Sequence, residues 1–336
     1  MKQFILRQAF YPIDIFNEDV YGINKMNIQQ LEYIIAVDNY RSFAKAAEAC
    51  FITQSTLSLM IQRLEEELSV YIFDRSRQPV TPTEVGKGII EKAKNVIKEI
   101  ADIRETASSF REEIKGELKL GIIPTVAPYI LPVFLKSFLR KYPGLKFKIS
   151  ELTTDLIIEK LEKNIIDVGI LASPAKSGSL TEQPLYTEEL VVYASPGESV
   201  LSKKVLIPND INADHLWLLE EGHCLRSQIL NICEMRKKDL RSGILEYNAG
   251  SIDSLIKLVD QNEGITILPE LAVLYMSPKQ KACIRHFKAP VPVREICLAV
   301  NKHFVKARIL NVLCREITDN IQELLAKNTK QKIVER

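Results

Sequence analysis

The sequence predicts an α/β protein with an N-terminal winged helix-turn-helix, a long connecting helix and a two-part α/β domain. Three observations predict this fold class. Residues 27–68 show helical spacing interrupted by a short alanine-rich segment, and residues 84–115 form one long amphipathic pattern. After Gly116, short apolar runs alternate with helical patterns. A chain of 336 residues is long enough for two or three such domains.

Composition and charge exclude several protein classes. Hydrophobic residues make up 46% of the chain and charged residues 26%, which is typical of globular proteins and unlike disordered or fibrous ones. The net charge of +2 gives no overall attraction for a polyanion, so any nucleic-acid contact must use a local surface.

The cysteines and the N-terminus indicate the compartment. Six cysteines are too sparse for a small secreted disulfide scaffold, and no apolar run approaches the ~18 residues of a membrane span. The start, MKQFILRQAF, lacks a small-residue cleavage site, so it does not resemble a signal peptide. We therefore expect a cytoplasmic protein with reduced thiols and no membrane partner.

The first elements form a helix-turn-helix. Residues 1–25 precede the pattern as an extension of unknown role, either real or the result of a start codon assigned too early. Helices are predicted from residue 27, over 43–49 and over 53–68; the alanines of the middle helix let its neighbour cross closely. Residues 70–80 predict a short strand pair that would form a wing.

A long helix follows over residues 84–115. Its single apolar stripe predicts packing against a partner helix, and therefore dimerisation. The alternative is that this helix packs against its own domain.

The remainder predicts a parallel, doubly wound α/β domain. Such sheets bind ligands at the carboxyl ends of their strands, near helix N-termini. The predicted strands are 117–123, 146–152, 168–171, 190–194, 216–219, 244–247, 265–268 and 296–300, and the predicted helices are 127–141, 154–163, 225–234, 252–261 and 305–326.

The helix over 53–68 has the polarity of a DNA-recognition helix. Its first half carries amides, hydroxyls and one arginine but no acid, which suits an N-terminal half placed in the major groove. Arginines in the wing could contact flanking phosphates. The candidate DNA-contacting residues are Gln54, Ser55, Thr56, Ser58, Gln62, Arg63, Arg75 and Arg77. The alternative is a solvated polar face, since residues 26–115 hold twelve basic residues against fourteen acidic ones.

The amino-acid sequence of this region resembles that of the LysR-type transcriptional regulators. The resemblance rests on AAEACFITQSTLSLMIQRLEEELSVYIFDR and the later TPTEVG, and it extends over nearly everything after Met26. It implies a winged helix-turn-helix domain over 26–83, a dimerising linker helix over 84–115 and a regulatory domain over 116–326. That regulatory domain would resemble periplasmic binding proteins.

The resemblance also implies finer organisation and partners. Subdomain I would comprise residues 116–189 and 294–326, and subdomain II residues 190–293, with crossings near Leu190 and Val293; residues 327–336 would be a polar tail. The partners implied are double-stranded promoter DNA, which the protein would bend, other copies of this chain in a homotetramer, and RNA polymerase.

The segment LLEEGHCLRSQILNICE, residues 218–234, stands apart chemically. Cys224 lies at a predicted helix N-terminus, with His223 before it and Arg226 two residues on, and each feature favours thiolate over thiol. No metal site is expected, because a Cys-x-x-Cys pair with matching ligands is absent from the sequence. The alternative is that Cys224 and Cys233 are inert core residues, which is what we expect of Cys50, Cys283, Cys297 and Cys314.

The spacing of the two thiols suggests a switch. If the segment between them is helical, nine residues separate them by about 14 Å, whereas a disulfide needs Cα atoms within roughly 7 Å. A sulfenic acid formed on Cys224 by peroxide would be trapped by Cys233 only if this helix unwinds. Such a rearrangement could repack an interface between subunits.

The same segment is similar to the peroxide-sensing branch of the LysR-type family, as are residues 120–132 and 265–273. The resemblance implies that Cys224 is the peroxidatic cysteine and Cys233 the resolving one. It also implies that Thr125, Thr154, His223 and Arg294 form the peroxide pocket, although either threonine could instead cap a helix. Ala127 replaces a glycine of the family pattern, and residues 235–247 do not follow that pattern.

We therefore predict a homo-oligomeric activator of oxidative-stress genes without a cofactor, switched by a Cys224–Cys233 disulfide that a thioredoxin or glutaredoxin would reduce. Three alternatives are open. A metabolite-responsive LysR-type regulator would bind a small acid near Thr125, and a thiol peroxidase would use the cysteines catalytically, which the helix-turn-helix disfavours. A solute-binding transport protein is disfavoured by the missing export signal.

Overall fold

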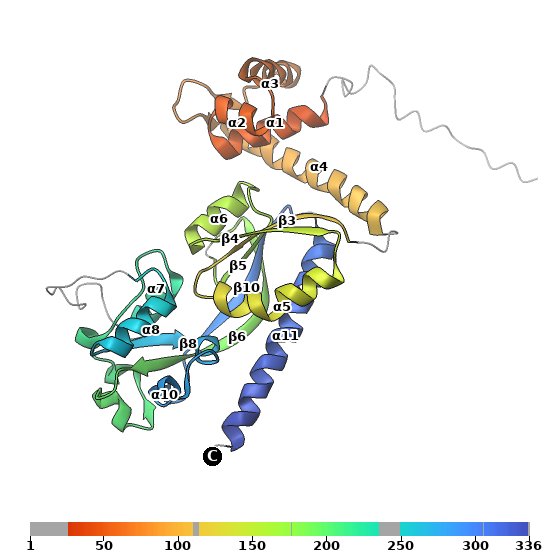
Figure 1. Cartoon of the computed structure of the whole chain (residues 1–336). Helices are drawn as coiled ribbons and strands as arrows, with labels where there is room; N and C mark the ends of the chain where they lie inside the picture. Colours follow the sequence, from red (N-terminus) through yellow and green to blue (C-terminus); the bar gives the residue numbers. More distant parts are fainter. Residues whose placement is uncertain (1–25, 110–113, 176, 235–248, 305, 335–336) are drawn as a thin grey trace, which may run out of the picture. The chain divides into compact units, whose positions relative to one another are not determined.

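The computed structural model describes residues 26–109, 114–175, 177–234, 249–304 and 306–334 (Figure 1). The contacts divide the chain into two units, residues 1–102 and 103–336, which are considered separately. The predicted N-terminal extension, the predicted strand over 244–247 and residues 110–113 of the predicted linker helix lie outside the described residues. Within those described, no helix is both long and apolar enough to cross a bilayer.

The first unit contains the helix-turn-helix. It consists of α1 (Ile28–Tyr40), α2 (Phe43–Ala49) and α3 (Gln54–Leu68). The side chains of Asn27, Ser42 and Thr53 cap these helices by accepting backbone N–H groups, which fixes where each helix begins. Buried apolar side chains from all three helices form one core.

The wing follows α3 and leads into the long helix. Strand β1 (Phe73–Asp74) pairs antiparallel with β2 (Thr81–Pro82), so the second strand starts just after the predicted 70–80 segment. Helix α4 runs from Glu84 to Ser109. The predicted linker helix was too long at its end, because residues 114 and 115 are not helical and lead directly into the next strand.

The second unit is built on a mixed sheet. The described strands are β3 (Gly116–Ile122), β4 (Leu145–Glu151), β5 (Val168–Ala172), β6 (Leu180–Ala194), β7 (Val205–Leu206), β8 (Ile265–Pro269), β9 (Ile284–Phe287) and β10 (Val293–Asn301). Their order is β4-β3-β5-β10-β6-β9-β7, with β8 also paired to β6. The prediction of parallel pairing holds for β3 with β4 and β5. It was wrong for β10, which runs antiparallel to both β5 and β6.

Strand β6 is long and changes its partners along its length. Residues 180–189 of β6 pair with β10, whereas residues 190–194 pair with β8 and β9. The exchange of partners at Leu190 lies where the first crossing was expected. One continuous apolar core runs through both parts of this unit.

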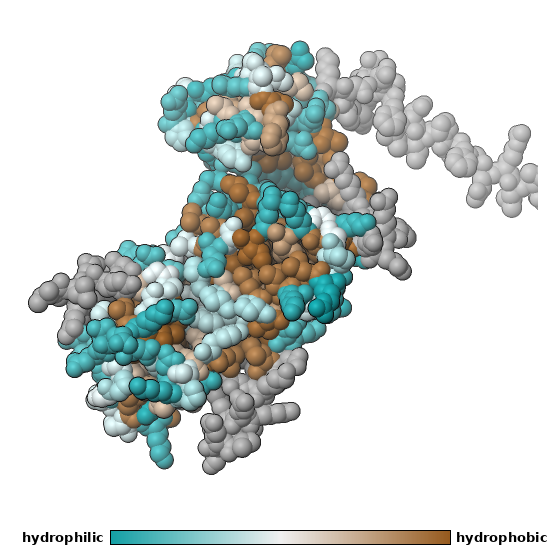
Figure 2. All heavy atoms as spheres, viewed as in Figure 1, coloured by the Kyte–Doolittle hydropathy of each residue, from teal (hydrophilic) through white to brown (hydrophobic). Residues whose placement is uncertain are grey.

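Helices cover the sheet. Besides four short 3-10 or α-helical turns, the unit has α5 (Ala127–Lys141), α6 (Thr154–Glu162), α7 (Cys224–Ile232), α8 (Ile252–Gln261), α9 (Glu270–Val273) and α11 (Ala307–Val334) among its described residues. Helices α5 and α11 lie side by side (Figure 1), joined by an ion pair between Lys141 and Glu316 with N···O of 2.7 Å. Hydrophobic residues gather around α5 on the face shown in Figure 2.

Two further predictions need correction. Residues 216–219 do not form a regular strand; Leu216 and Leu219 make one isolated bridge each, to Ile265 and Ala249. The backbone N–H of Trp217 donates to the carbonyl of Ile265 at 2.8 Å, and its indole N–H donates to the carbonyl of Glu263 at 3.0 Å. The predicted helix over 305–326 ended too early, because α11 continues to Val334 through most of the predicted polar tail.

The wing depends on a glycine in α4. A Cβ at Gly86 would lie 2.0 Å from the carbonyl oxygen of Ile72, whereas a Cβ at Gly88, in the same helix, would meet no atom within 4 Å. We predict that Gly86→Ala destabilises the first unit by about 1–3 kcal/mol through overpacking. Gly88→Ala should instead stabilise it by up to about 1 kcal/mol, because alanine favours the helix.

Urea unfolding followed by far-UV circular dichroism measures both changes in the full chain. Equal effects of the two substitutions would contradict the close packing of α4 on the wing.

Candidate functional site

Cys224 is the first residue of α7, at the positive end of the helix dipole. Gly222, with φ of 96°, makes the turn before it, and His223 is the N-cap. A Cβ at Gly222 would approach the Cγ2 of Thr153 to 3.6 Å, so this turn lies against the start of α6. The turn that precedes Cys224 therefore lies near the N-terminus of α6, whose first residue is Thr154.

Cys233 closes the other end of the same helix. Its backbone N–H donates to the carbonyl of Ile229 at 3.0 Å, and its side chain is buried. Burial raises the pKa of the Cys233 thiol to about 11. Both cysteines are free, and nine residues of helix place their Cα atoms about 14 Å apart. In this conformation the two thiols are too far apart to form a disulfide.

Arg294 and Thr125 form a buried pair. Arg294 lies on β10 and is 2% exposed. Its Nη1 donates to the Thr125 hydroxyl and its Nη2 to the Thr125 carbonyl, each at 3.1 Å. Its Nε donates to Oε1 of Glu188 at 2.9 Å. The hydrogen bonds of the guanidinium are therefore made to Thr125 and Glu188. The guanidinium can act on Cys224 through its positive charge.

Neighbouring groups keep the Arg294 guanidinium protonated. Burial alone would lower the pKa of the guanidinium, but the Glu188 carboxylate and, to smaller extents, Tyr186 and Cys224 raise it above its ordinary value. The guanidinium and the Cys224 side chain therefore interact electrostatically across the site.

The remaining two predicted pocket residues, His223 and Thr154, have buried polar atoms. His223 is 6% exposed, and its Nε2 lies 3.7 Å from Oε1 of Glu220. The hydroxyl of Thr154 is buried and has no hydrogen-bond partner among the described residues. The N-caps of α5 and α6 are Val126 and Thr153, and neither makes a side-chain cap. The helix-capping alternative for Thr125 and Thr154 therefore has no support in this structure.

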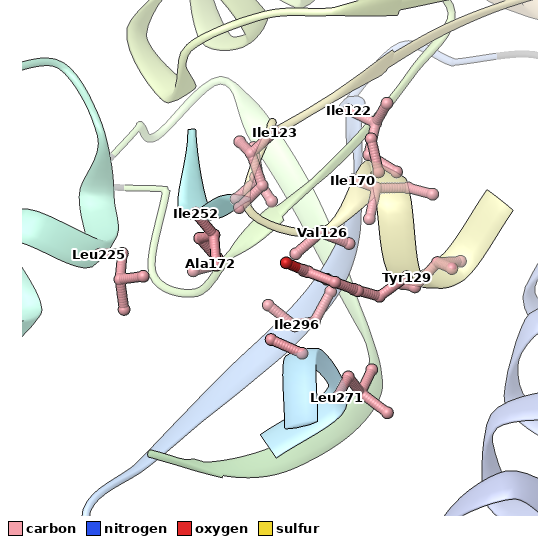
Figure 3. Packing of buried hydrophobic residues seen from close by; sticks show 14 of the residues in the cluster. Ile122, Ile123, Val126, Tyr129, Ile170, Ala172, Leu225, Ile252, Leu271 and Ile296 are labelled. Carbon is pink, nitrogen blue, oxygen red and sulfur yellow. The ribbon is translucent and has the colours of Figure 1, made fainter. Parts of the chain in front are cut away.

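The surroundings of this site are apolar. Figure 3 shows the hydroxyl of Tyr129 pointing in among Val126, Ala172 and Ile252, with Leu225 of α7 on the far side. Burial strongly raises the pKa of Tyr129, so its hydroxyl stays protonated. The polar groups therefore act in a low-dielectric setting, which strengthens their electrostatic effects.

Sequence reasoning missed Glu188 and the two tyrosines, Tyr129 and Tyr186. The predicted strand began at residue 190, so positions 186 and 188 lay outside it. In the structure they belong to β6 and lie opposite Ile296 and Arg294. Alternation of Tyr186, Glu188 and Leu190 along one face was the available signal.

The other cysteines agree in part with the expectation of core residues. Cys297 and Cys314 are buried, and burial raises the pKa of both thiols. Cys50 and Cys283 are only half-buried. No group of His, Cys, Asp and Glu side chains within the described ranges could hold a metal ion.

The candidate DNA contacts lie mostly on the exposed side of α3. Gln54, Ser55, Thr56, Gln62 and Arg63 are exposed. The Thr53 hydroxyl lies 2.9 Å from that of Ser55 and 2.8 Å from that of Thr56, which orders the start of the helix. Gln62 donates to Glu66 at 2.9 Å, so a base contact by this amide must exchange that bond.

The two wing arginines are tied to acidic residues. Buried Glu65 accepts the backbone N–H groups of Ile72 and Phe73, and it also pairs with Nη2 of Arg75 at 2.9 Å. Arg75 further lies 5.0 Å above the ring of Phe43 and donates to the partly buried Ser58. Arg77 pairs with Asp74 at 3.0 Å. Arg75 thus holds the wing against α3, a structural role that the sequence did not reveal.

Comparison with known families divides the chain into an N-terminal and a C-terminal segment. Residues 28–87 match "Bacterial regulatory helix-turn-helix protein, lysR family", and residues 111–321 match "LysR substrate binding domain". The chain belongs to the LysR family of transcriptional regulators. As in that family, a helix-turn-helix DNA-binding segment precedes a regulatory α/β domain.

Within the LysR family, the chain is similar to proteins named for peroxide. It is 30% identical over 300 residues to the "Hydrogen peroxide-inducible genes activator" of Haemophilus influenzae, covering 89% of this chain and 99% of that protein. It is 33% identical over 248 residues to the "DNA-binding transcriptional dual regulator OxyR" of Escherichia coli, covering 74% and 80%.

Solved structures give the same result. A full-length OxyR variant from Pseudomonas aeruginosa superposes with a TM-score of 0.67 at 30% identity, covering 87% of this chain and 98% of that one. An H₂O₂-bound OxyR mutant from Corynebacterium glutamicum superposes with a TM-score of 0.59 at 26% identity, covering 91% and 96%.

The raised pKa of Cys233 makes a testable difference in thiol reactivity. A thiol with a pKa of about 11 rather than 9.0 holds about a hundredfold less thiolate at pH 8. We predict that iodoacetamide labels Cys233 in the folded, reduced LysR-family chain about a hundredfold more slowly than in the urea-unfolded chain. Peptide mass spectrometry of timed samples measures both rates, and similar rates would contradict the burial of Cys233.

The Glu65 network predicts a second outcome. Glu65→Ala leaves two buried N–H groups and Arg75 without their acceptor, which should destabilise the first unit by about 3 kcal/mol or more. Glu66→Ala, one residue along the same helix and exposed, should change stability by less than about 0.5 kcal/mol. Urea denaturation compares the two variants; a similar small effect for both would refute a structural role for Glu65.

Proposed function

We propose that this LysR-family regulator senses hydrogen peroxide and activates oxidative-stress genes through a reversible Cys224–Cys233 disulfide. The observation that carries the proposal is the placement of Cys224. It lies at the N-terminus of α7, it interacts electrostatically with Arg294, and a buried free thiol lies at the other end of the same helix. The similarity to peroxide-inducible activators supports the same function.

The proposed chemistry has two steps. The Cys224 thiolate attacks one oxygen of H₂O₂, the O–O bond breaks, and the second oxygen leaves as hydroxide that takes a proton to become water. Cys224 is then a sulfenic acid. The Cys233 thiol, deprotonated as it leaves its buried position, attacks that sulfur and displaces the hydroxyl group as water. Two thiols and one peroxide thus give one disulfide and two waters.

The pocket residues have matching proposed roles. The free hydroxyl of Thr154 would accept or donate a hydrogen bond to the peroxide, and the Thr125 hydroxyl would hold its second oxygen. His223 and the charge of Arg294 would stabilise the leaving oxygen as the O–O bond breaks. Hydroxyl, imidazole and guanidinium groups around one thiol fit a small polar oxidant better than a large metabolite.

Disulfide formation requires α7 to unwind. The buried residues of α7 are Leu225 and Ile229, and both pack in the core of the regulatory unit. Unwinding of α7 therefore rearranges that core. In the proposed switch, this rearrangement changes how copies of the chain assemble and so how the helix-turn-helix units reach DNA.

We propose partners and organisation on the same basis. The domain limits would be 26–83, 84–115 and 116–326, with α4 dimerising the chain and the regulatory units completing a homotetramer. The partners would be promoter DNA, RNA polymerase and a cytoplasmic dithiol reductant such as thioredoxin or glutaredoxin. The apolar area around α5 supports contact between regulatory units (Figure 2).

The disulfide itself gives the first prediction of this proposal. One equivalent of H₂O₂ should convert the full-length chain to a form with a Cys224–Cys233 crosslink, detected by peptide mapping without reductant. Cys224→Ser should abolish both the crosslink and promoter activation by peroxide. Cys283→Ser, a half-buried thiol elsewhere in the same unit, is the matched control and should retain both.

A metabolite-responsive regulator would behave differently in this test. It would keep both thiols intact after one equivalent of peroxide, and Cys224→Ser would leave its promoter response unchanged. Either result would contradict the proposed function.

The exposed amides of α3 give a second prediction. Gln54→Ala should weaken operator binding by about 1–3 kcal/mol and leave non-specific DNA binding unchanged, because amides read base edges. Gln29→Ala, an exposed amide on α1, is the control and should change neither. Fluorescence anisotropy at fixed salt measures both affinities; equal weakening of specific and non-specific binding would contradict base reading by Gln54.

A further inference from the structure

Glu188 is a buried carboxylate to which the proposed mechanism gives no part. It lies on β6, is 2% exposed, and has an ion pair with Arg294 at 2.8 Å between Oε1 and Nη2. Its second oxygen, Oε2, accepts the backbone N–H of Leu271 in α9 at 3.3 Å. The carboxylate therefore joins both crossing strands to a third element.

The Glu188 carboxylate also opposes the positive charge of Arg294, the guanidinium that interacts electrostatically with Cys224. Thr125 contacts the guanidinium through a neutral hydroxyl and a carbonyl, so within the described structure Glu188 is the charged group in hydrogen-bond contact with Arg294. Both members of the pair are shielded from solvent, so the field of each is weakly screened. A negative charge less than 3 Å from the guanidinium cancels much of its field at a distance.

We propose that Glu188 is a positioning residue that orients Arg294 and sets how much of its positive charge reaches Cys224. The inference rests on the proposed function for its biological meaning: Glu188 keeps the sensing thiol less reactive than an unopposed arginine would make it. Its physical content concerns only the reactivity of Cys224 and holds for any electrophile.

Other ionisable groups near the site are the same in every variant compared. They are Tyr129 on α5, Tyr186 on β6, Glu220 and His223 before α7, Arg226 on α7, Asp253 on α8 and Glu270 on α9. The Nη1 of Arg226 donates to the carbonyl of Leu219, which keeps that guanidinium beside the turn before α7. None of these residues is substituted in the variants compared, and the two tyrosines, which interact with Glu188, stay protonated because burial raises the pKa of both.

The test measures alkylation of Cys224 by iodoacetamide in the reduced full-length chain, from about pH 5 to about pH 9, by peptide mass spectrometry. In Glu188→Gln the amide oxygen still accepts from Arg294, but the charge of Arg294 is unopposed. The midpoint of the pH–rate profile should fall by about one pH unit, so that alkylation below the midpoint becomes about tenfold faster. Glu188→Asp keeps the charge and should keep the midpoint of the unsubstituted chain.

The matched control is Glu182→Gln, on the same strand. Its carboxylate accepts the N–H of Ala175 and lies 3.3 Å from the sulfur of Cys297, away from the Arg294 pair. It should leave the midpoint unchanged. The double variant Glu188→Gln/Arg294→Gln removes both charges, a replacement that buried ion pairs often tolerate. Its midpoint should lie above that of the unsubstituted chain.

The predicted order of midpoints is therefore Glu188→Gln, then the unsubstituted chain, then the double variant. Slower alkylation at every pH with an unchanged midpoint in Glu188→Gln would mean a purely structural role and would overturn the inference. If Glu188→Gln does not fold, the double variant is compared with Arg294→Gln, which keeps the Glu188 charge: the midpoint should be lower in the double variant, and equal midpoints would overturn the inference. Because no peroxide is used, these results are independent of whether the chain forms a peroxide-induced disulfide.

Discussion

The hydrogen-bonded backbone of α7 keeps two thiols apart, and the account of this protein depends on that separation. Cys224 begins the helix and Cys233 caps it, with the Cys233 N–H bonded to Ile229. About 14 Å of helix cannot coexist with a disulfide that needs Cα atoms within roughly 7 Å. Oxidation and helix are therefore alternatives, and any reaction that joins the sulfurs must reorganise the segment between them.

Buried charge pairs organise both units of the chain. In the first unit, Glu65 fastens the wing to α3 and holds Arg75 in place. In the second, Glu188 and Thr125 hold Arg294 in the core. Each arginine is fixed by a carboxylate that is itself anchored to backbone N–H groups. Such pairs cost desolvation free energy and are strongly destabilised when one partner is removed, which makes the geometry around them specific.

Sequence patterns predicted the helices more fully than the strands. The bounds of α2, α5 and α8 agree with the predicted ranges, because each begins at a clear cap or turn and carries an amphipathic repeat. The first half of β6 escaped prediction because Pro184 and the acids around it hide the alternation. Antiparallel pairing of β10 depends on contacts between segments over a hundred residues apart, which local patterns do not encode.

The candidate site was predictable where chemistry follows local position. Cys224 and His223 could be assigned to a helix N-terminus from their neighbours alone. The partners of Arg294 could not, because Thr125 and Glu188 come from other elements and meet it only in the folded chain. Arg75 illustrates the same limit: its position in the wing predicted a phosphate contact, whereas the fold also pairs it with Glu65.

Amide hydrogen exchange before and after one equivalent of H₂O₂ tests the central claim most directly. The account predicts that oxidation forms the Cys224–Cys233 crosslink and that residues 226–233 lose their protection in the same molecules, while α8, over 252–261, stays protected. A crosslinked chain in which residues 226–233 exchange as slowly as in the reduced chain would contradict it, because helix and disulfide would then coexist.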